Sequence, residues 1–217
     1  MPEGDLKATP ITQLVRNPGR ADYDRDSVNQ IIDATPLCHI SYIIDGRPYV
    51  TPTLQWREGD TIYWHGSSAS RFLRQIVDKE VCMAITHFDG FVLARSSFHH
   101  SINYRSIMLF GQATKIEDND KNALLDSFVE TLIPGRLETL RQMTDQEAKA
   151  TTVFSMAIDE GSAKVRTGPP VDDDEDYALP IWAGVLPISQ ILHDPIPDPK
   201  NQSGLEIPQH IRDFKLG

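Results

Sequence analysis

The sequence has few cysteines and no long apolar run, and each shortage excludes a class of protein. Its 217 residues include only two cysteines, Cys38 and Cys82, each inside an apolar, strand-like segment. Structural disulfides are therefore not expected, and a reducing cytoplasm fits this composition. No apolar stretch approaches the length of a membrane span, and the first residues lack the basic-then-apolar pattern of a secretory signal. We therefore predict a cytoplasmic protein that does not associate with membranes.

Several common binding motifs are also missing. No spacing of cysteine and histidine resembles a zinc site, and no glycine-rich nucleotide-binding loop joins a strand to a helix. The adjacent His99 and His100 would point to opposite faces of an extended segment, so we expect no metal site. The formal net charge of −10 argues against nucleic-acid binding, which depends on surplus lysine and arginine.

Positive charge is nevertheless concentrated in the middle of the chain. Residues 61–111 contain five lysines and arginines against three acidic residues, and four of the seven histidines. A locally basic centre in an acidic protein favours a small anionic ligand. Chance unevenness of charge is the simpler alternative.

The most informative segment is 61–74, with the sequence TIYWHGSSASRFLR. It predicts an aromatic strand, a loop of small and hydroxyl residues, and a basic helix start at which Ser70 can be the N-cap. The backbone N–H groups of the loop, the helix N-terminus and the guanidinium groups of Arg71 and Arg74 would together suit a phosphate ester. An ordinary serine-capped loop is the alternative, and these residues alone do not separate the two.

Apolar periodicity predicts a mainly β fold, an antiparallel β-barrel with peripheral helices. We expect strands at 37–44, 49–56, 61–64, 81–87, 91–96, 104–116, 153–158, 163–166 and 182–188, and helices at 24–34, 70–77, 121–133 and from about 136. The dipeptides Asp45-Gly46 and Asp89-Gly90 are predicted turns, and Thr144 to Glu147 match a capping box. A doubly wound parallel sheet is disfavoured because the first strands lack crossover helices.

Three regions are expected along the chain. Residues 1–22 would form an N-terminal extension, and residues 23–190 a single barrel domain with a helical insertion at about 120–150. Residues 191–217 are rich in proline and predict an extended arm, which wraps a partner subunit or stays mobile.

Six segments, in this order, resemble the pyridoxamine 5′-phosphate oxidase-like superfamily of FMN-binding split barrels, and most closely its flavin-nucleotide-binding branch that includes nitroimidazole-resistance proteins. They are PGR (18–20), TPTLQW (51–56), YWHGSSASR (63–71), FDGFVLARSSFHHSINYRSIMLFG (88–111), SAKVRTGPP (162–170) and LPIWAGVLP (179–187). The resemblance covers roughly residues 19–187. It implies a six-stranded, antiparallel, Greek-key-like split barrel that forms a homodimer with FMN at the subunit interface.

The resemblance also implies a set of cofactor-binding residues. Ser70 and Arg71 would hold the flavin phosphate, with Ser67 and Ser68 as further donors. The remaining residues would lie along the flavin or approach it across the dimer interface; they are Thr51, Pro52, Thr53, Leu54, Trp64, His65, Arg105, Ser106, Lys164, Arg166 and Trp182. His65 is also the candidate proton donor, since the ordinary pKa of a histidine side chain suits proton transfer near neutrality. A histidine that only hydrogen-bonds the loop backbone is the alternative.

Two departures from the family pattern shape the expected function. Members that oxidise pyridoxamine phosphate usually carry an arginine and a lysine on the second strand, where this chain has Thr53 and Gln55 or nearby neutral residues. They also carry an Arg-Leu-His element, which is absent after Trp182. The resemblance therefore implies an FMN-dependent oxidoreductase that reduces a small electron-poor compound such as a nitroaromatic. A flavin carrier or sensor without turnover, and a haem- or deazaflavin-binding barrel, are the alternatives.

Overall fold

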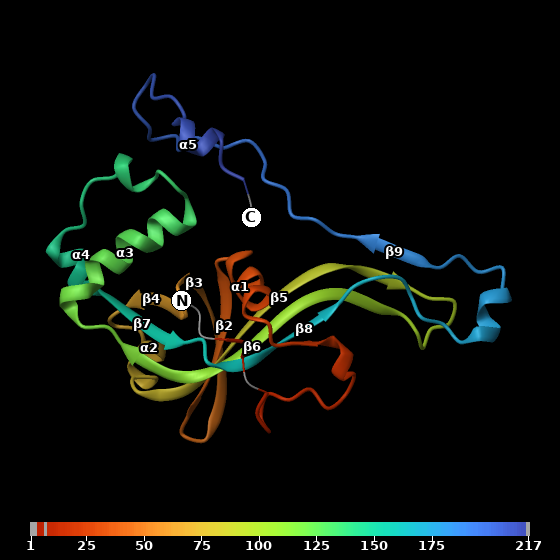
Figure 1. Cartoon of the computed structure of the whole chain (residues 1–217). Helices are drawn as coiled ribbons and strands as arrows, with labels where there is room; N and C mark the ends of the chain where they lie inside the picture. The colour runs from red at the N-terminus through yellow and green to blue at the C-terminus, as the bar shows by residue number, and fades with distance from the viewer. Residues whose placement is uncertain (1–3, 7, 216–217) are drawn as a thin grey trace.

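Six antiparallel strands close into a ring in the computed structural model, which describes residues 4–6 and 8–215 (Figure 1). In ring order they are β2 (Leu37–Ile44), β3 (Arg47–Glu58), β4 (Thr61–Ser67), β7 (Thr151–Ala157), β6 (Ser101–Lys115) and β5 (Lys79–Leu93), with β5 and β6 paired to complete the ring. The predicted antiparallel barrel is therefore confirmed.

The β2–β3 hairpin shows how the sequence sets the register of the barrel. Asp45 and Gly46 form its two-residue turn with φ values of 51° and 74°, as the turn type that suits twisted antiparallel strands requires. Side chains along β2 alternate between the barrel interior and its outer face, and Cys38 and Ile40 on the inner side are fully buried. The predicted hairpin is confirmed.

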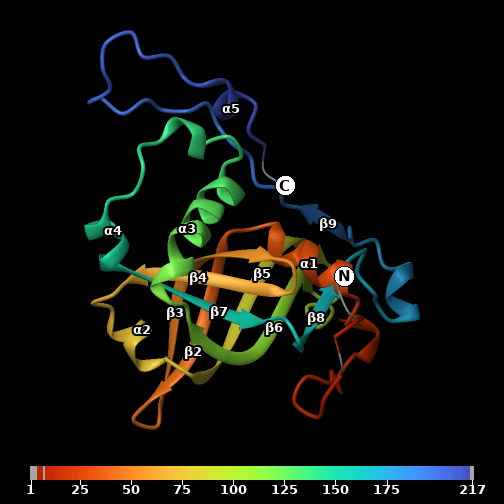
Figure 2. The ribbon, with the colours of Figure 1, turned by 60° about the vertical axis from the view of Figure 1, so that its left-hand side comes forward.

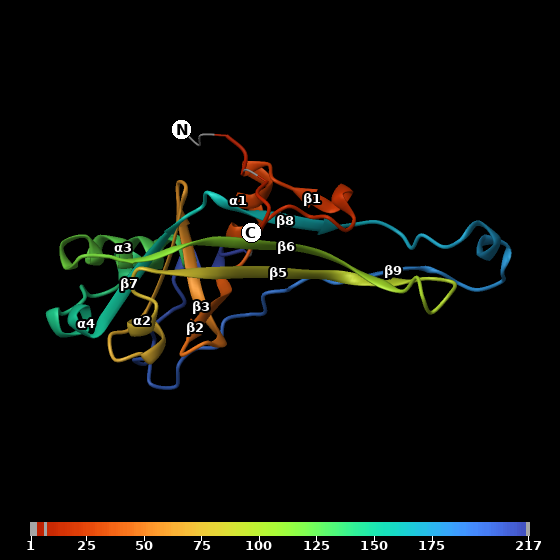
Figure 3. The ribbon, with the colours of Figure 1, turned by 90° about the horizontal axis from the view of Figure 1, so that it is seen from below.

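The segment around Asp89-Gly90 corrects one predicted turn. β5 is a single strand of 15 residues that continues through this dipeptide, and its pairing with β6 shifts between Phe88 and Gly90. Asp89 is therefore the extra residue of a β-bulge, not the corner of a hairpin. Figure 3 shows β5 and β6 running side by side along the molecule beyond the ring.

Three short strands extend the sheet outside the ring. β8 (Glu160–Arg166) pairs with β6, β1 (Ala21–Asp22) pairs with β8, and β9 (Gly184–Pro187) pairs with the far end of β5. The strand predicted from Trp182 is thus shorter, because it begins at Gly184.

The helices lie outside the barrel (Figure 2). The two longer helices are α1 (Arg25–Asp33), which lies within the predicted helix 24–34 and is capped by Asp24, and α3 (Asp118–Leu132). The shorter helices are α2 (Arg71–Gln75), α4 (Asp145–Ala150) and α5 (Gln209–Arg212). The predicted capping box at Thr144 is present at the start of α4. The 3₁₀ turns are η1 (Pro18–Arg20), η2 (Leu137–Thr139) and η3 (Asp174–Ala178). The helix predicted from about 136 is wrong, since only the turn η2 forms there before α4.

Two apolar cores hold these elements together. The larger core fills the barrel interior and includes Trp64 and Phe154, whereas Trp56, Leu125 and Val153 form a smaller core under α3. The C-terminal arm leaves β9 and crosses above the barrel to α5 near α3 (Figures 1 and 2). Within the described residues, no helix is both long and apolar enough to cross a membrane.

Candidate functional site

In the serine-rich loop after β4, the backbone N–H groups are hydrogen-bonded within the protein and not left open as the sequence predicted. β4 continues to Ser67, which pairs with Thr151 of β7. The backbone N–H groups of Ser68, Ala69 and Ser70 donate to Ala150 O, Ser67 Oγ and Ser67 O at 2.8, 3.2 and 2.8 Å. The prediction that these N–H groups face an anion is therefore wrong, because each already has an acceptor.

Side chains remain available for an anion at this loop. Ser70 occupies the N-cap position of α2, but its hydroxyl makes no capping hydrogen bond. The guanidinium carbon of Arg71 lies 5.9 Å from the centre of the Tyr49 ring, and none of the described acidic side chains forms an ion pair with Arg71. Since α2 has only five residues, the positive charge here comes from Arg71 more than from a helix dipole.

The residues predicted on β3 alternate in orientation. Pro52 and Leu54 are exposed on the outer face, and Thr51 and Thr53 are half-buried. The hydroxyl of Thr51 lies 3.0 Å from the hydroxyl of Tyr42. Only alternate side chains of this segment can therefore contact a ligand on the outer face.

Trp64 and His65 lie on opposite faces of β4. Trp64 is fully buried in the barrel and stacks on Phe154 with ring centres 5.7 Å apart. The expectation that Trp64 and His65 both lie along the flavin is therefore wrong for the side chain of Trp64, since neighbouring residues of a strand point in opposite directions. His65 points outward, beneath α3.

His65 borders a cavity of about 430 Å³ between β4, α3 and the segment leading into α4, lined by apolar side chains and by Asp126, Arg141 and Glu147. Its ring meets Phe128 edge-on at 4.5 Å, and its Nδ1 is buried without a hydrogen-bond partner among the described residues. Burial lowers the pKa of His65, so the imidazole is neutral near pH 7. A neutral imidazole can accept a proton or ligate a metal, whereas donating a proton as a general acid requires the charged form that burial disfavours.

A second group of predicted residues lies on β6 and β8. Arg105 forms a two-bond ion pair with Asp89 at 3.0 and 2.9 Å, which raises the pKa of Arg105. Ser106 donates to the carbonyl of Lys164 at 3.3 Å. Arg166 is buried, which lowers its pKa, and it donates to Asn103 Oδ1.

Trp182 lies outside both groups. Its side chain is 67% exposed just before β9, and its ring lies over Gly184, where an added Cβ would come within 3.0 Å. In Figures 1 and 3, α2 and the serine loop lie at one end of the molecule, and β8 and β9 extend toward the other. The single chain does not bring these predicted residues together.

A further cavity, of about 610 Å³, contains residues that the sequence did not single out. Arg105 lines it together with His39, His87 and residues 188–190 of the C-terminal arm. His87 Nε2 lies 2.9 Å from the carbonyl of Ile31. Because alternate side chains of β2 point outward, the sequence alone could have identified His39 as a residue of the outer face.

Comparisons with known proteins agree with this architecture. A family model described as pyridoxamine 5′-phosphate oxidase matches residues 24–165. The flavocytochrome Anf3 from Azotobacter vinelandii is 46% identical, with a TM-score of 0.92 over 96% of this chain and 98% of that chain. The FAD and heme binding protein from Mycobacterium smegmatis is 36% identical, with a TM-score of 0.87 over 89% and 96% of the two chains.

A candidate 5-nitroimidazole antibiotic resistance protein from Bacteroides thetaiotaomicron shares the fold at 23% identity. Its TM-score is 0.52 over 67% of this chain and 86% of that chain. No curated protein matches the chain.

Proposed function

Because the chain belongs to the pyridoxamine 5′-phosphate oxidase-like superfamily of FMN-binding split barrels, we propose that it binds a flavin and acts as a flavin-dependent oxidoreductase. The observation that carries this proposal is the 46% identity to a flavocytochrome over nearly the whole chain. A bound flavin supplies hydride or single-electron transfer, while the protein binds and orients it and controls access to it.

Arg71 is the residue best placed to hold the flavin phosphate. Its guanidinium has no acidic partner among the described residues, and the hydroxyls of Ser68 and Ser70 lie in the same loop. Pro52 and Leu54 offer an apolar strip on the outer face of β3 for the flat ring. FMN is the form we propose; FAD is the form named for the Mycobacterium smegmatis protein.

A second copy of the chain would complete this site. Arg105 and Ser106 lie on β6, away from the serine loop, so they could reach the same flavin only from another subunit. The proposed substrate is a small electron-poor compound such as a nitroaromatic. Oxidation of pyridoxamine phosphate is disfavoured because the neutral Thr53 and Gln55 offer no charge to its phosphate.

Replacement of Arg71 by alanine tests the phosphate site. We expect Arg71→Ala to weaken flavin binding roughly tenfold or more, because a hydrogen bond to a charged group contributes about 1.5–3 kcal/mol. Flavin titration followed by absorbance gives the affinity, and the mass of the cofactor released from the wild type separates FMN from FAD. Arg47→Ala, at an exposed position on β3, is the matched control. Unchanged affinity in Arg71→Ala would reject this site.

Turnover separates an enzyme from a carrier. Oxidation of a reduced pyridine nucleotide by the flavin-loaded protein, with nitroaromatic compounds as acceptors, supports the oxidoreductase. Tight flavin binding with no turnover on any acceptor would favour the carrier or sensor instead.

Haem binding is a second candidate, favoured by the cavity at His65. The two relatives at 46% and 36% identity are a flavocytochrome and an FAD and heme binding protein. In this chain the neutral imidazole of His65 borders a cavity lined by the apolar Phe128, Leu125 and Met143 and also by the charged Asp126, Arg141 and Glu147. Histidine in apolar surroundings is a common axial ligand of haem iron, so these residues fit the group.

Titration with haemin tests this candidate. We expect one equivalent of haemin to give a sharp Soret band with the wild type and with His100→Ala, whose side chain is exposed. His65→Ala should lose that band or shift it. A Soret band unaltered by His65→Ala would place the haem elsewhere, and its absence from the wild type would reject haem binding.

A further inference from the structure

Arg71, the residue proposed above to hold the flavin phosphate, rests on an aromatic ring and not on a carboxylate. Its guanidinium carbon lies 5.9 Å from the centre of the Tyr49 ring, within the range of a cation–π contact. Arg71 is exposed, and no described residue forms an ion pair with it or accepts a hydrogen bond from it. Its N–H groups are therefore available to an anion from solvent.

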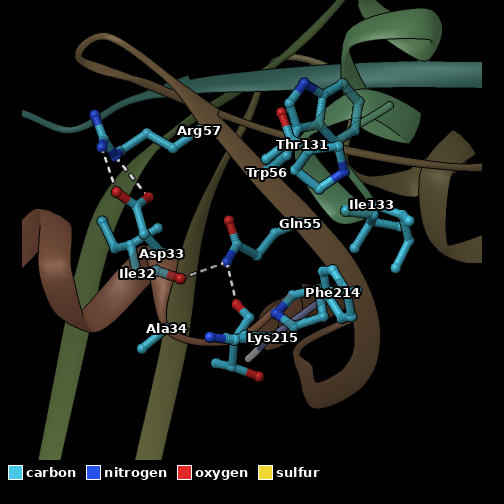
Figure 4. Close-up of a pocket in the computed structure, with 14 residues that line it drawn as sticks. Ile32, Asp33, Ala34, Gln55, Trp56, Arg57, Thr131, Ile133, Phe214 and Lys215 are labelled. Atoms are coloured by element: carbon cyan, nitrogen blue, oxygen red, sulfur yellow. Dashed lines mark hydrogen bonds and ion pairs between the residues drawn. The ribbon is translucent and has the colours of Figure 1, made fainter. Parts of the chain in front are cut away.

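Arg57, on the same strand as Tyr49, shows the opposite arrangement (Figure 4). Asp33 accepts a hydrogen bond from Nε of Arg57 at 2.9 Å and a second one from Nη2. A guanidinium paired in this way has its charge neutralised and one edge occupied. A guanidinium held by a ring instead leaves its five N–H donors to a ligand.

The ring of Tyr49 is itself packed against a second tyrosine. Tyr42 and Tyr49 are cross-strand partners in the β2–β3 hairpin, and their rings stack with centres 5.6 Å apart and planes 13° apart. Tyr42 is only 9% exposed, and its hydroxyl lies 3.0 Å from that of Thr51. Packing on a buried, hydrogen-bonded ring restricts the orientation of Tyr49.

The helix that carries Arg71 is anchored to the same hairpin. Phe72, the next residue of α2, meets Tyr42 with ring centres 4.8 Å apart. Leu73 is buried and so close to β4 that a Cβ added at Gly66 would come within 3.0 Å of it. Together with the two preceding contacts, these close a circuit between α2 and the hairpin, so both elements set the place of the guanidinium.

The Tyr49 ring and the apolar strip proposed for the flavin lie on opposite faces of β3. Tyr49 shares its face with Thr51, whereas Pro52 and Leu54 project from the other. β3 pairs with β4 only from Gln55 onward, so the edge between these two faces has no partner strand among the described residues. A flavin that crosses this edge can place its ring on one face and its phosphate on the other.

We propose that Tyr49 is a positioning residue of the phosphate site: its ring holds the guanidinium of Arg71 where the flavin phosphate binds. A long side chain that is already held in place loses less rotational freedom when it binds its ligand, which raises the affinity. The inference rests on the proposed function, because it assumes that the flavin phosphate binds at Arg71.

FMN and riboflavin test the proposal as a matched pair of ligands, since riboflavin lacks only the phosphate. Tyr49→Leu removes the ring and should weaken FMN binding about threefold, as expected for an exposed cation–π contact, while riboflavin affinity stays unchanged. Tyr49→Phe keeps the ring and should bind FMN as the wild type does. Phe98→Leu, at an 86% exposed ring between β5 and β6, is the matched control and should change neither affinity. Quenching of flavin fluorescence measures all of these affinities.

A double-mutant cycle shows whether Tyr49 acts through Arg71. In an Arg71→Ala background, Tyr49→Leu should cause no further loss of FMN affinity, because the guanidinium that the ring positions is already absent. Additive losses, or equal losses for FMN and riboflavin in Tyr49→Leu, would show that the ring is only a packing residue and would overturn the proposal. If Tyr49→Leu does not fold, the longer side chain of Tyr49→Met takes its place in the same cycle.

The outcomes for the wild type separate this inference from the proposed function. A wild type that binds no flavin would reject the proposed function and this role with it. Equal wild-type affinity for FMN and riboflavin would reject the phosphate site. A wild type that prefers FMN, with the preference unchanged in Tyr49→Leu, would overturn the role of Tyr49 alone.

Discussion

Burial of His65 links the stability of this protein to pH. Its ring is packed against Phe128, and its Nδ1 has no hydrogen-bond partner among the described residues, so a proton would place charge in apolar surroundings. The pKa of His65 is therefore below the ordinary value of 6.5. In the unfolded chain the imidazole keeps its ordinary pKa, so the unfolded state takes up the proton first as the pH falls.

The free energy of unfolding should therefore fall when the pH is lowered from 8 through 6.5 toward 5. Carboxylates contribute to the same trend, but a His65→Gln variant isolates the histidine: it should lose less stability over this interval than the wild type. Urea denaturation at pH 8, 6 and 5 measures the difference. His100→Gln, at an exposed histidine, should behave as the wild type does. An identical pH dependence in His65→Gln would show that its burial has no energetic consequence.

Sequence pattern identified the residue types of the candidate site better than their surroundings. The serines and Arg71 could be found from their spacing, but the free guanidinium of Arg71 follows from contacts between distant segments. The misplacement of Trp64 was avoidable, because strand alternation alone puts Trp64 and His65 on opposite faces. The sequence could not have predicted that the amide oxygen of Gln55 is left without a hydrogen-bond partner among the described residues, because the hydrogen bonds of this amide depend on where α1 ends.

At the scale of elements, the bulge in β5 makes room for β9. Gly90 has φ 153°, and a Cβ added there would lie 2.6 Å from the carbonyl oxygen of Leu186 and 3.0 Å from Cα of Pro187. Leu186 and Pro187 belong to β9, which pairs with β5 from this point onward. Glycine is therefore required because the two backbones approach closely.

Gly90→Ala should destabilise the protein by about 1–3 kcal/mol and release β9 from β5, because backbone atoms cannot yield to the new methyl group. Urea denaturation measures the loss of stability, and amide hydrogen exchange over Gly184–Pro187 reports the release of β9. Gly19→Ala, with nothing within 4 Å of the added Cβ, should change stability by less than about 0.5 kcal/mol. Native protection of β9 in Gly90→Ala would contradict this account.

Two Asp-Gly dipeptides show the limit of local signals for predicting elements. Asp45-Gly46 joins strands that pair with each other, so the flanking residues specify the hairpin. Asp89-Gly90 lies within a strand whose two halves both pair with β6, and only that long-range pairing makes it a bulge. The helix at 24–34 and the barrel strands were predictable because their apolar periodicity is strong, whereas the short β9 depends on tertiary contacts.

At the scale of the whole molecule, one face of the barrel is unusually apolar. Leu37 and Ile43 on β2 are 48% and 71% exposed, and Val50 and Leu54 on β3 are 60% and 40% exposed. Leu37 pairs with Leu54, and Val50 pairs with Ser41, two residues from Ile43 on the same side of β2, so all four project from one face. Contiguous apolar surface of this kind is typical of a protein interface.

This face should join two copies of the chain. Light scattering after size-exclusion chromatography should give twice the 24.4 kDa of one chain for the wild type and one chain for the double variant Ile43→Lys, Val50→Lys, because burying two lysines against a second copy is costly. Val15→Lys, at an 86% exposed residue of the N-terminal segment, should remain dimeric. If the flavin lies at the interface, the double variant should also lose flavin. A monomeric double variant that keeps full flavin affinity would show that each chain binds its flavin alone. A monomeric wild type would reject the dimer.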